Sequence, residues 1–145
     1  MSYTDSLIRI KNSLTRGKVY TDALIRIKNS LARGKERVKF PYSKFDLEIL
    51  DVLSKAGYLE SVARKGRGVR RIIEVKLKYK DGGAPSISGI KFVSRPSRRI
   101  YTGYREIKRS HQGYGNFLLS TPEGVMTDRE ARRKKVGGQI LFEIW

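Results

Sequence analysis

The chain begins with a segment that occurs twice. Residues 3–18 return almost unchanged as residues 20–35. The copies differ at two positions, occupied by Ser6 and Thr15 in the first copy and by Ala23 and Ala32 in the second. Each copy predicts a short helix, because a threonine near its start is a possible N-cap and a glycine near its end is a typical C-cap signal. Two copies are too few for a solenoid, which needs at least three repeats. The repeat is therefore interpreted as a local duplication of one helix.

Only one of the two copies can fill a single helix position in a folded domain. The second copy carries an apolar stripe at three- and four-residue spacing, formed by Leu24, Ile27 and Leu31. Placing the first copy in the same position would loop out 17 residues, at a cost of about 1–2 kcal/mol in closure entropy. We therefore expect the second copy to pack in the core. The extra copy, residues 1–19, is expected to be frayed, self-associating or held by a neighbouring molecule.

The segment after the repeat predicts a strand followed by a helix. Residues 37–40 alternate between polar and apolar side chains, and Pro41 ends the strand. Ser43 is a plausible N-cap for the amphipathic stretch that follows, and Gly57 stands where a helix C-cap is expected.

A hairpin and a chain break come next. Residues 58–64 and 69–79 predict two strands, and the glycine-containing tip at residues 65–68 predicts the turn between them. Glycines and a proline within residues 81–87 interrupt the pattern. We place a domain boundary there.

The second half predicts strands and one helix. Residues 87–93 and 116–120 are strand candidates, and residues 121–124 predict a tight turn with proline at its second position. A capping box at residues 127–130 predicts the start of a helix. After two glycines, residues 139–145 predict a terminal strand.

The charge of the chain narrows the class of partner. There are 32 Lys and Arg against 14 Asp and Glu, a formal net charge of +18. Basic side chains replace counterions on a phosphate backbone, so RNA or DNA is the leading partner. A membrane-surface helix would gather its bases on one polar face, whereas here they lie in predicted loops and strands as well. With no apolar run of about 18 residues and no signal-peptide pattern, we expect neither a membrane protein nor a secreted one.

Catalytic and metal-binding groups are scarce. The chain has no cysteine and one histidine, which excludes disulfides, thiolate catalysis, cysteine zinc sites and histidine metal clusters. His111 has no local acid or nucleophile motif beside it, so it is interpreted as a solvent-exposed or RNA-facing side chain. Glu123, Asp128 and Glu130 could form a metal-binding carboxylate group, but helix capping explains Asp128 and Glu130. We expect no enzyme activity, cofactor, structural metal or small-molecule substrate.

Two segments suit contact with RNA. Arginines and tyrosines alternate over residues 98–105, where arginine can neutralise phosphate and tyrosine can stack on unpaired bases. An edge strand with a solvated basic face is the alternative. The turn at residues 121–124 and the glycine pair at 137–138 would let the backbone approach RNA closely.

Several motifs together resemble the bacterial small-subunit ribosomal protein eight family. They are residues 94–101, residues 119–132 with their Ser-Thr-Pro-Glu-Gly-Val-Met-Thr-Asp run, and residues 136–139 with their glycine pair. The similarity continues through residues 38–44, the helix end at Gly57, and residues 22–29. It covers nearly everything from residue 20 to residue 145.

The resemblance implies an α+β fold of two small α/β domains. Residues 20–84 would run helix-strand-helix-strand-strand, and residues 85–145 would place strands around one helix and bind rRNA. The implied function is that of a structural, non-catalytic small-subunit protein that binds the central domain of small-subunit rRNA early in assembly. Implied partners are that rRNA, neighbouring proteins such as protein five of the small subunit, and a stem in the chain's own mRNA. The implied location is the ribosome in the cytoplasm.

The resemblance and the basic clusters together define the candidate RNA-binding residues. The centre of the surface is expected at Ser120, Thr121 and Pro122, with Gly124, Gly138 and Gln139 beside it. The basic and aromatic candidates are Arg95, Arg98, Arg99 and Tyr101, and the first half would add Lys28, Asn29 and Lys44. A stand-alone RNA- or DNA-binding regulator, such as a translational repressor, is the alternative function.

Two candidate positions depart from the family pattern. Glu123 stands where the family usually carries a basic residue, so we expect one phosphate contact to be missing or to be replaced by neighbouring basic residues. Gln139 stands where the family favours glutamate, which keeps an acceptor and loses a charge. Base recognition is expected to relax at this position.

Overall fold

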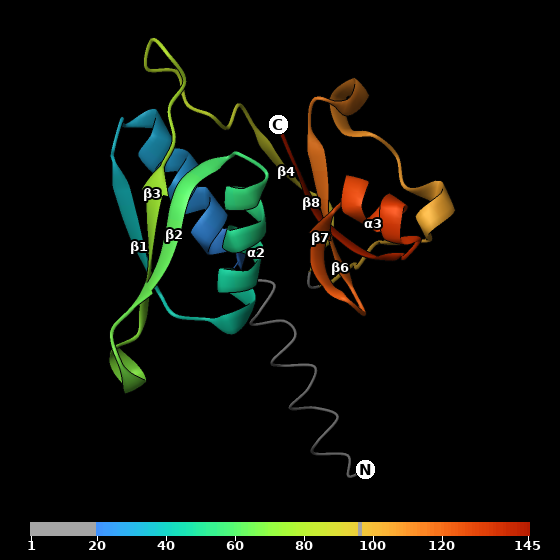
Figure 1. Cartoon of the computed structure of the whole chain (residues 1–145), viewed down its shortest axis with the longest axis horizontal. Coiled ribbons are helices and arrows are strands. Elements are labelled where there is room, and N and C mark those ends of the chain that lie inside the picture. Colours follow the sequence, from blue (N-terminus) through green and yellow to red (C-terminus); the bar gives the residue numbers. More distant parts are fainter. Residues whose placement is uncertain (1–19, 96) are drawn as a thin grey trace.

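The structure is a computed structural model that describes residues 20–95 and 97–145, and of residues 111 and 112 the backbone only. The expectations for residues 1–19, including the first copy of the repeat, and for the side chain of His111 lie outside the described part. The described residues form an α+β fold with two antiparallel sheets (Figure 1). No described helix is long and apolar enough to cross a membrane.

The first sheet is built from the first half of the chain. Residues 20–32 are helical. They are followed by β1 (Arg37–Pro41), α2 (Lys44–Lys55), β2 (Leu59–Lys65) and β3 (Ile72–Leu77). The strand order is β1-β3-β2, with both pairings antiparallel. The predicted order of helix, strand, helix, strand, strand is confirmed.

The ends of α2 follow the expected cap signals in part. Gly57 has a φ of +93°, which favours glycine, and the Tyr58 N–H donates to Leu53 O at 3.0 Å. Together with the Gly57 N–H bonded to Ser54 O at 3.1 Å, this is a Schellman end. Ser43 occupies the N-cap position, but its side chain makes no cap hydrogen bond.

The prediction of one strand over residues 69–79 is wrong at both ends. A 3-10 turn over Gly68–Arg70 replaces its beginning, and Val69 is fully exposed there. Its end leaves the sheet as well, because Tyr79 forms only an isolated bridge with Pro85. The alternation of apolar and polar residues continues beyond the residues that pair with a neighbouring strand. Periodicity alone therefore does not show where strand pairing stops.

The second sheet comes from the second half of the chain. Its strands are β4 (Ile90–Phe92), β5 (Tyr101–Thr102), β6 (Asn116–Thr121), β7 (Gly124–Thr127) and β8 (Gly138–Ile144). The order is β4-β8-β6-β7, and β5 also pairs with β8. Strand β7 was not predicted, and β4 was predicted too long. For residues 98–105 an edge strand was only the alternative interpretation, and β5 covers two of these residues. Strand β7 was missed because its residues were assigned to the turn and to the helix cap that flank it.

The helix of the second half is α3 (Asp128–Lys134), and it begins as predicted. The Glu130 N–H donates to the Thr127 hydroxyl at 3.4 Å, which makes Thr127 the N-cap. Lys135 follows the helix with a left-handed φ of 57°.

The second sheet buries apolar side chains on both faces. Leu118 and Phe142 lie in the core shared with the first half, whereas Leu119 packs with Met126 and with Ala131 of α3. A register shift opposite Leu118 and Leu119 leaves Leu141 without a partner on β6. Because of this bulge, both Leu141 and Phe142 join the shared core.

Aromatic rings join the two halves of the chain. The Tyr20 ring lies 6.0 Å from that of Phe45 in α2 and 6.1 Å from that of Phe142 in β8, centroid to centroid. Phe92 of β4 completes the group, 6.4 Å from Phe142. Helix 20–32 and α2 therefore pack against both sheets, and one continuous core spans the halves. The division into domains at residues 84 and 85 stays a prediction.

The second copy of the repeat fills the helix position, as expected. Leu24, Ile27 and Leu31 are 3% exposed or less. Ala23 is also buried, at 6% exposed, and the first copy has Ser6 at the corresponding position. A serine there would bury a hydroxyl group without an assured partner, which is unfavourable. The second copy is thus favoured in this helix position by its residues as well as by its short connection to β1.

A shortened chain tests this assignment. We expect a chain that lacks residues 1–17 to keep its free energy of unfolding within about 0.5 kcal/mol of the full chain, because the described core draws its helix from the second copy. Urea unfolding of both chains measures the difference. A loss of about 2 kcal/mol or more would contradict the assignment.

Candidate nucleic-acid interface

Three adjacent strands align three of the candidate residues in one row. Tyr101 of β5 is the register partner of Gln139 of β8, and Gln139 is the partner of Ser120 of β6. Partners in an antiparallel register project from the same face. The row therefore presents an aromatic ring, an amide and a hydroxyl side by side, and Tyr101 is 66% exposed. A ring can stack on a base, while an amide and a hydroxyl can bond base edges or 2′-OH groups.

The hairpin between β6 and β7 holds the next group of candidates. The Thr121 hydroxyl donates to Gly124 O at 2.8 Å and accepts from the Glu123 N–H at 3.2 Å. Thr121 is 9% exposed, whereas Pro122 and Glu123 at the tip are exposed. The hydroxyl of Thr121 thus shapes the turn, and the tip residues form its accessible surface.

The residue that anchors this hairpin was not among the predicted site residues. Glu48 of α2 accepts a hydrogen bond from the Val125 N–H at 2.8 Å. A Cβ at Gly124 would lie 3.1 Å from the same Glu48 oxygen, and Gly124 has a φ of +115°. A glutamate on a helix normally indicates a solvated face, so no local signal points to this role.

Gly138 brings β6 and β8 close together beside the row. A Cβ at this position would overlap the carbonyl oxygen of Ser120 and would lie 2.9 Å from the carbonyl carbon of the same residue. Gly137 is crowded in the same way by the carbonyl of Thr102. The glycine pair was predicted to allow a close approach to RNA, which stays a prediction. The structure shows a close approach to the protein's own backbone at both glycines.

The basic loop before β5 is a tight turn pinned to the sheet. Arg95 and Arg98 exchange backbone hydrogen bonds of 2.9 and 3.0 Å. Ser94 is buried, donates to Ile140 O, and accepts from the Ile100 N–H at 2.9 Å. The exposed side chains of Arg95 and Arg98 therefore extend from a loop that is hydrogen-bonded to the sheet.

A hollow of about 50 Å³ lies between this loop and the first half of the chain. Its lining residues are Tyr20, Phe45, Ser94, Arg95, Arg99, Gln139 and Leu141. Lys44 precedes Phe45 and is exposed, so it lies at the same end of α2. Lys28 and Asn29 are exposed on helix 20–32, eight and nine residues beyond Tyr20, or about 12 Å along the helix axis. The structure thus gathers most candidates around the hollow and leaves Lys28 and Asn29 apart.

A second basic hollow lies beside α3. It has a volume of about 320 Å³ and is lined by Arg109, Gly113, Arg129 and Arg132. The Arg129 side chain donates to Gly113 O, and Arg132 pairs with Asp128 at 3.3 Å. Positioned guanidinium groups of this kind can bind a phosphate. This hollow was not predicted from the sequence, because Arg109 and Gly113 are distant in sequence from Arg129 and Arg132.

Of the carboxylates considered as metal ligands, Asp128 has structural partners instead. Asp128 is buried and accepts from the Asn116 side chain at 3.0 Å as well as pairing with Arg132. Within the described ranges, no group of three or more potential metal-ligating His, Asp or Glu side chains comes together.

The chain is similar to proteins of one family. The family described as "Ribosomal protein S8" matches residues 18–145. The "Small ribosomal subunit protein uS8" of Nitratiruptor sp. is 42% identical over 144 residues, which is 97% of this chain and 95% of the relative. The protein of the same name from Nautilia profundicola is 40% identical over 141 residues, 97% of this chain and 95% of the relative. The chain therefore belongs to the ribosomal protein S8 family, whose members are structural, non-enzymatic proteins of the small ribosomal subunit.

Proposed function

We propose that this chain binds and stabilises the central domain of small-subunit rRNA during assembly of the subunit. The observation that carries the proposal is the row of Tyr101, Gln139 and Ser120 across three strands, next to the basic loop. Together they combine groups that recognise unpaired bases with groups that neutralise phosphate.

Each part of the surface has a distinct task in this proposal. Tyr101 stacks on a base, and Gln139 and Ser120 bond to base edges or ribose hydroxyls. Arg95, Arg98 and the arginines beside α3 bind phosphates, which supplies salt-dependent affinity. The tip at Pro122 and the close strands at Gly138 bring the backbone near the RNA.

The proposal extends to domains and neighbours. Residues 85–145 form the rRNA-binding domain, and residues 20–84 form a second domain that adds contacts from Lys28, Asn29 and Lys44. On the ribosome in the cytoplasm, the partners include neighbouring proteins such as protein five of the small subunit. A stem in the chain's own mRNA is a further ligand of the same surface.

Binding to three nucleic acids tests the proposal. The purified chain is titrated with a central-domain rRNA stem, a scrambled RNA and duplex DNA across a salt series. We expect the stem to bind about a thousandfold more tightly than either competitor. Tyr101→Ala is expected to weaken stem binding by about five-fold or more, since stacking of one base contributes about 1–3 kcal/mol.

The matched control is Tyr114→Ala. Tyr114 is also exposed, at 88%, but lies outside the row. It should leave stem binding unchanged. Equal affinities and equal salt slopes for the three nucleic acids would contradict the proposal, because the +18 charge alone would then explain binding.

A further inference from the structure

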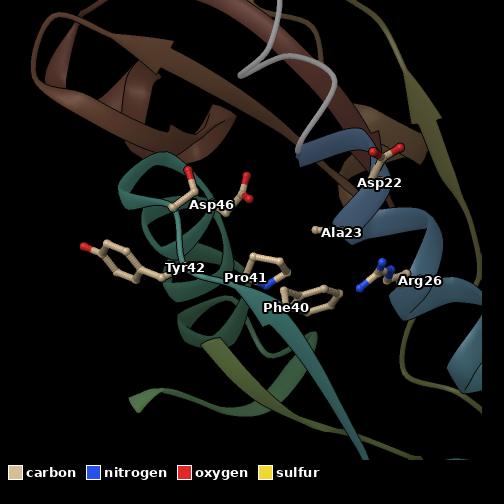
Figure 2. A pocket seen from close by; sticks show the side chains of 8 residues that line it. Asp22, Ala23, Arg26, Phe40, Pro41, Tyr42 and Asp46 are labelled. Carbon is tan, nitrogen blue, oxygen red and sulfur yellow. The ribbon is translucent and has the colours of Figure 1, made fainter. Parts of the chain in front are cut away.

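A hollow of about 290 Å³ lies on the first half of the chain, between helix 20–32, the end of β1 and the start of α2 (Figure 2). Its lining residues are Asp22, Ala23, Arg26, Phe40, Pro41, Tyr42, Ser43 and Asp46. Figure 2 shows Asp22 and Ala23 coming from one helix and Asp46 from the other, with Phe40 and Pro41 between them. None of these residues is a candidate RNA contact.

Asp46 is the unusual member of this lining. It is 2% exposed, and its Oδ1 atom is buried without a hydrogen-bond partner in the described structure. Burial, together with the smaller effect of the nearby Asp22 carboxylate, raises the pKa of Asp46 to about 6. A buried carboxylate with a free oxygen is unfavourable unless a donor or a cation reaches it.

The cations of the described chain do not fill this role. Arg26 lines the hollow, yet no ion pair within 4.0 Å joins it to Asp22 or to Asp46 in the described structure. The guanidinium groups of Arg64 and Arg71 lie over the Tyr42 ring, 5.7 and 4.8 Å from its centroid. They are thus engaged at Tyr42, whose side chain points away from the other lining residues (Figure 2).

The walls of the hollow decide what kind of cation fits. Ala23, Phe40 and Pro41 offer apolar surface below the two carboxylates. Magnesium prefers an octahedral shell of oxygens and its own waters, which apolar walls do not supply. Arginine and lysine have an apolar stem and a charged end, so they can pack the stem on such walls and present the charge to a carboxylate.

We propose that this hollow receives an arginine or lysine side chain of a protein partner, with the Asp46 and Asp22 carboxylates as its counter-charges. The same carboxylates repel the phosphates of RNA, so this face is suited to binding a protein. The row of Tyr101, Gln139 and Ser120 on the second sheet is suited to binding RNA. The inference concerns a different surface from the proposed rRNA contacts and does not depend on them.

The proposal predicts a pH dependence. The charged groups that face Asp46 across the hollow are Asp22 and Arg26 of helix 20–32, while β1 contributes the uncharged Phe40 and Pro41. With a pKa of about 6, Asp46 is mostly neutral at pH 5 and mostly ionised at pH 7.5. A cation binds the ionised form, so its affinity should fall about ten-fold from pH 7.5 to pH 5.

The experiment uses the full chain and a blocked Gly-Gly-Arg-Gly-Gly peptide as the probe, followed by NMR. At pH 7.5 we expect saturable shifts at Ala23 and Asp46 and a lower pKa for the Asp46 carboxyl group in the presence of the peptide. The same peptide with neutral citrulline in place of arginine should have no such effect. Asp46→Asn should weaken binding about five-fold or more, and Asp51→Asn, at an exposed position of the same helix, should not.

Other outcomes overturn the proposal. They are equal binding by the citrulline peptide, unchanged binding by Asp46→Asn, or no saturable shift up to about 50 mM peptide. Saturation of the same shifts by submillimolar MgCl₂ would instead assign a metal site. Stem RNA binding by Asp46→Asn is measured in parallel and should be unchanged, which separates this inference from the proposed function.

Discussion

Phe142→Ala is expected to lower the free energy of unfolding by about 4 kcal/mol, because truncating a fully buried phenylalanine removes apolar burial and leaves a cavity. Phe142 is 0% exposed and packs against Tyr20 and Phe92. Its ring therefore contacts both the helix of the first half and a strand of the second. Chemical denaturation followed by circular dichroism measures the loss.

The same measurement reports on the cooperativity of the two halves. Since one core spans both halves, we expect the wild-type chain to unfold in a single transition. Tyr101→Ala is the matched control, because Tyr101 is exposed and its removal should change stability by less than about 0.5 kcal/mol. Two separate transitions in the wild type, with Phe142→Ala shifting only one of them, would contradict a shared core.

Gly138→Ala is expected to destabilise the chain by about 3 kcal/mol, since overpacking against backbone atoms cannot be relieved by rotating a side chain. The added Cβ would overlap Ser120 O and would lie 3.0 Å from the Thr121 Cα atom. Strands β6 and β8 would have to separate next to the Tyr101, Gln139 and Ser120 row. Urea unfolding measures the loss, and the pattern of amide shifts locates it.

Gly103→Ala is the control for this substitution. A Cβ there meets only the carboxylate of Glu106, 2.5 Å away at the end of a flexible side chain. Gly103 also has an ordinary φ of −80°. We expect a change within about 0.5 kcal/mol. Equal stabilities of the two variants would show that strand spacing at Gly138 is not constrained.

The two variants of the site report on different properties in an RNA-binding measurement. If Gly138→Ala unfolds the site, the loss of RNA binding by this variant reports on strand geometry. Tyr101→Ala reports on the contact between the Tyr101 ring and RNA.

Local patterns were sufficient for most elements of the fold. The stripe of helix 20–32, the glycine that ends α2 and the threonine that begins α3 were read correctly, because caps and amphipathic stripes involve residues close in sequence. The errors fall where pairing with a distant strand decides the outcome. Strand β3 stops at Leu77 although the alternation continues, and β5 consists of two residues that are strand only because β8 lies beside them.

The candidate site also has features that the sequence predicts and features that depend on distant parts of the chain. Residue types and motifs predicted which side chains would face RNA, and the family comparison supports the ribosomal class of the protein. Sequence spacing could not show that Tyr101, Gln139 and Ser120 form one row, since they come from three strands that only the sheet brings together. It also missed Glu48, which reaches the β6–β7 hairpin from α2.

The sequence by itself determined the charge of +18, the absence of cysteine, the duplicated segment and the motifs of the family, because these are properties of composition and order. Only the tertiary structure decided which side chains meet. It buried Asp46 beside Asp22 with an oxygen that has no hydrogen-bond partner among the described residues, set Gly138 against the Ser120 carbonyl and joined the two halves through Tyr20 and Phe142. The physical reason is that desolvation and close packing depend on neighbours that are distant along the chain, and no local pattern encodes their positions.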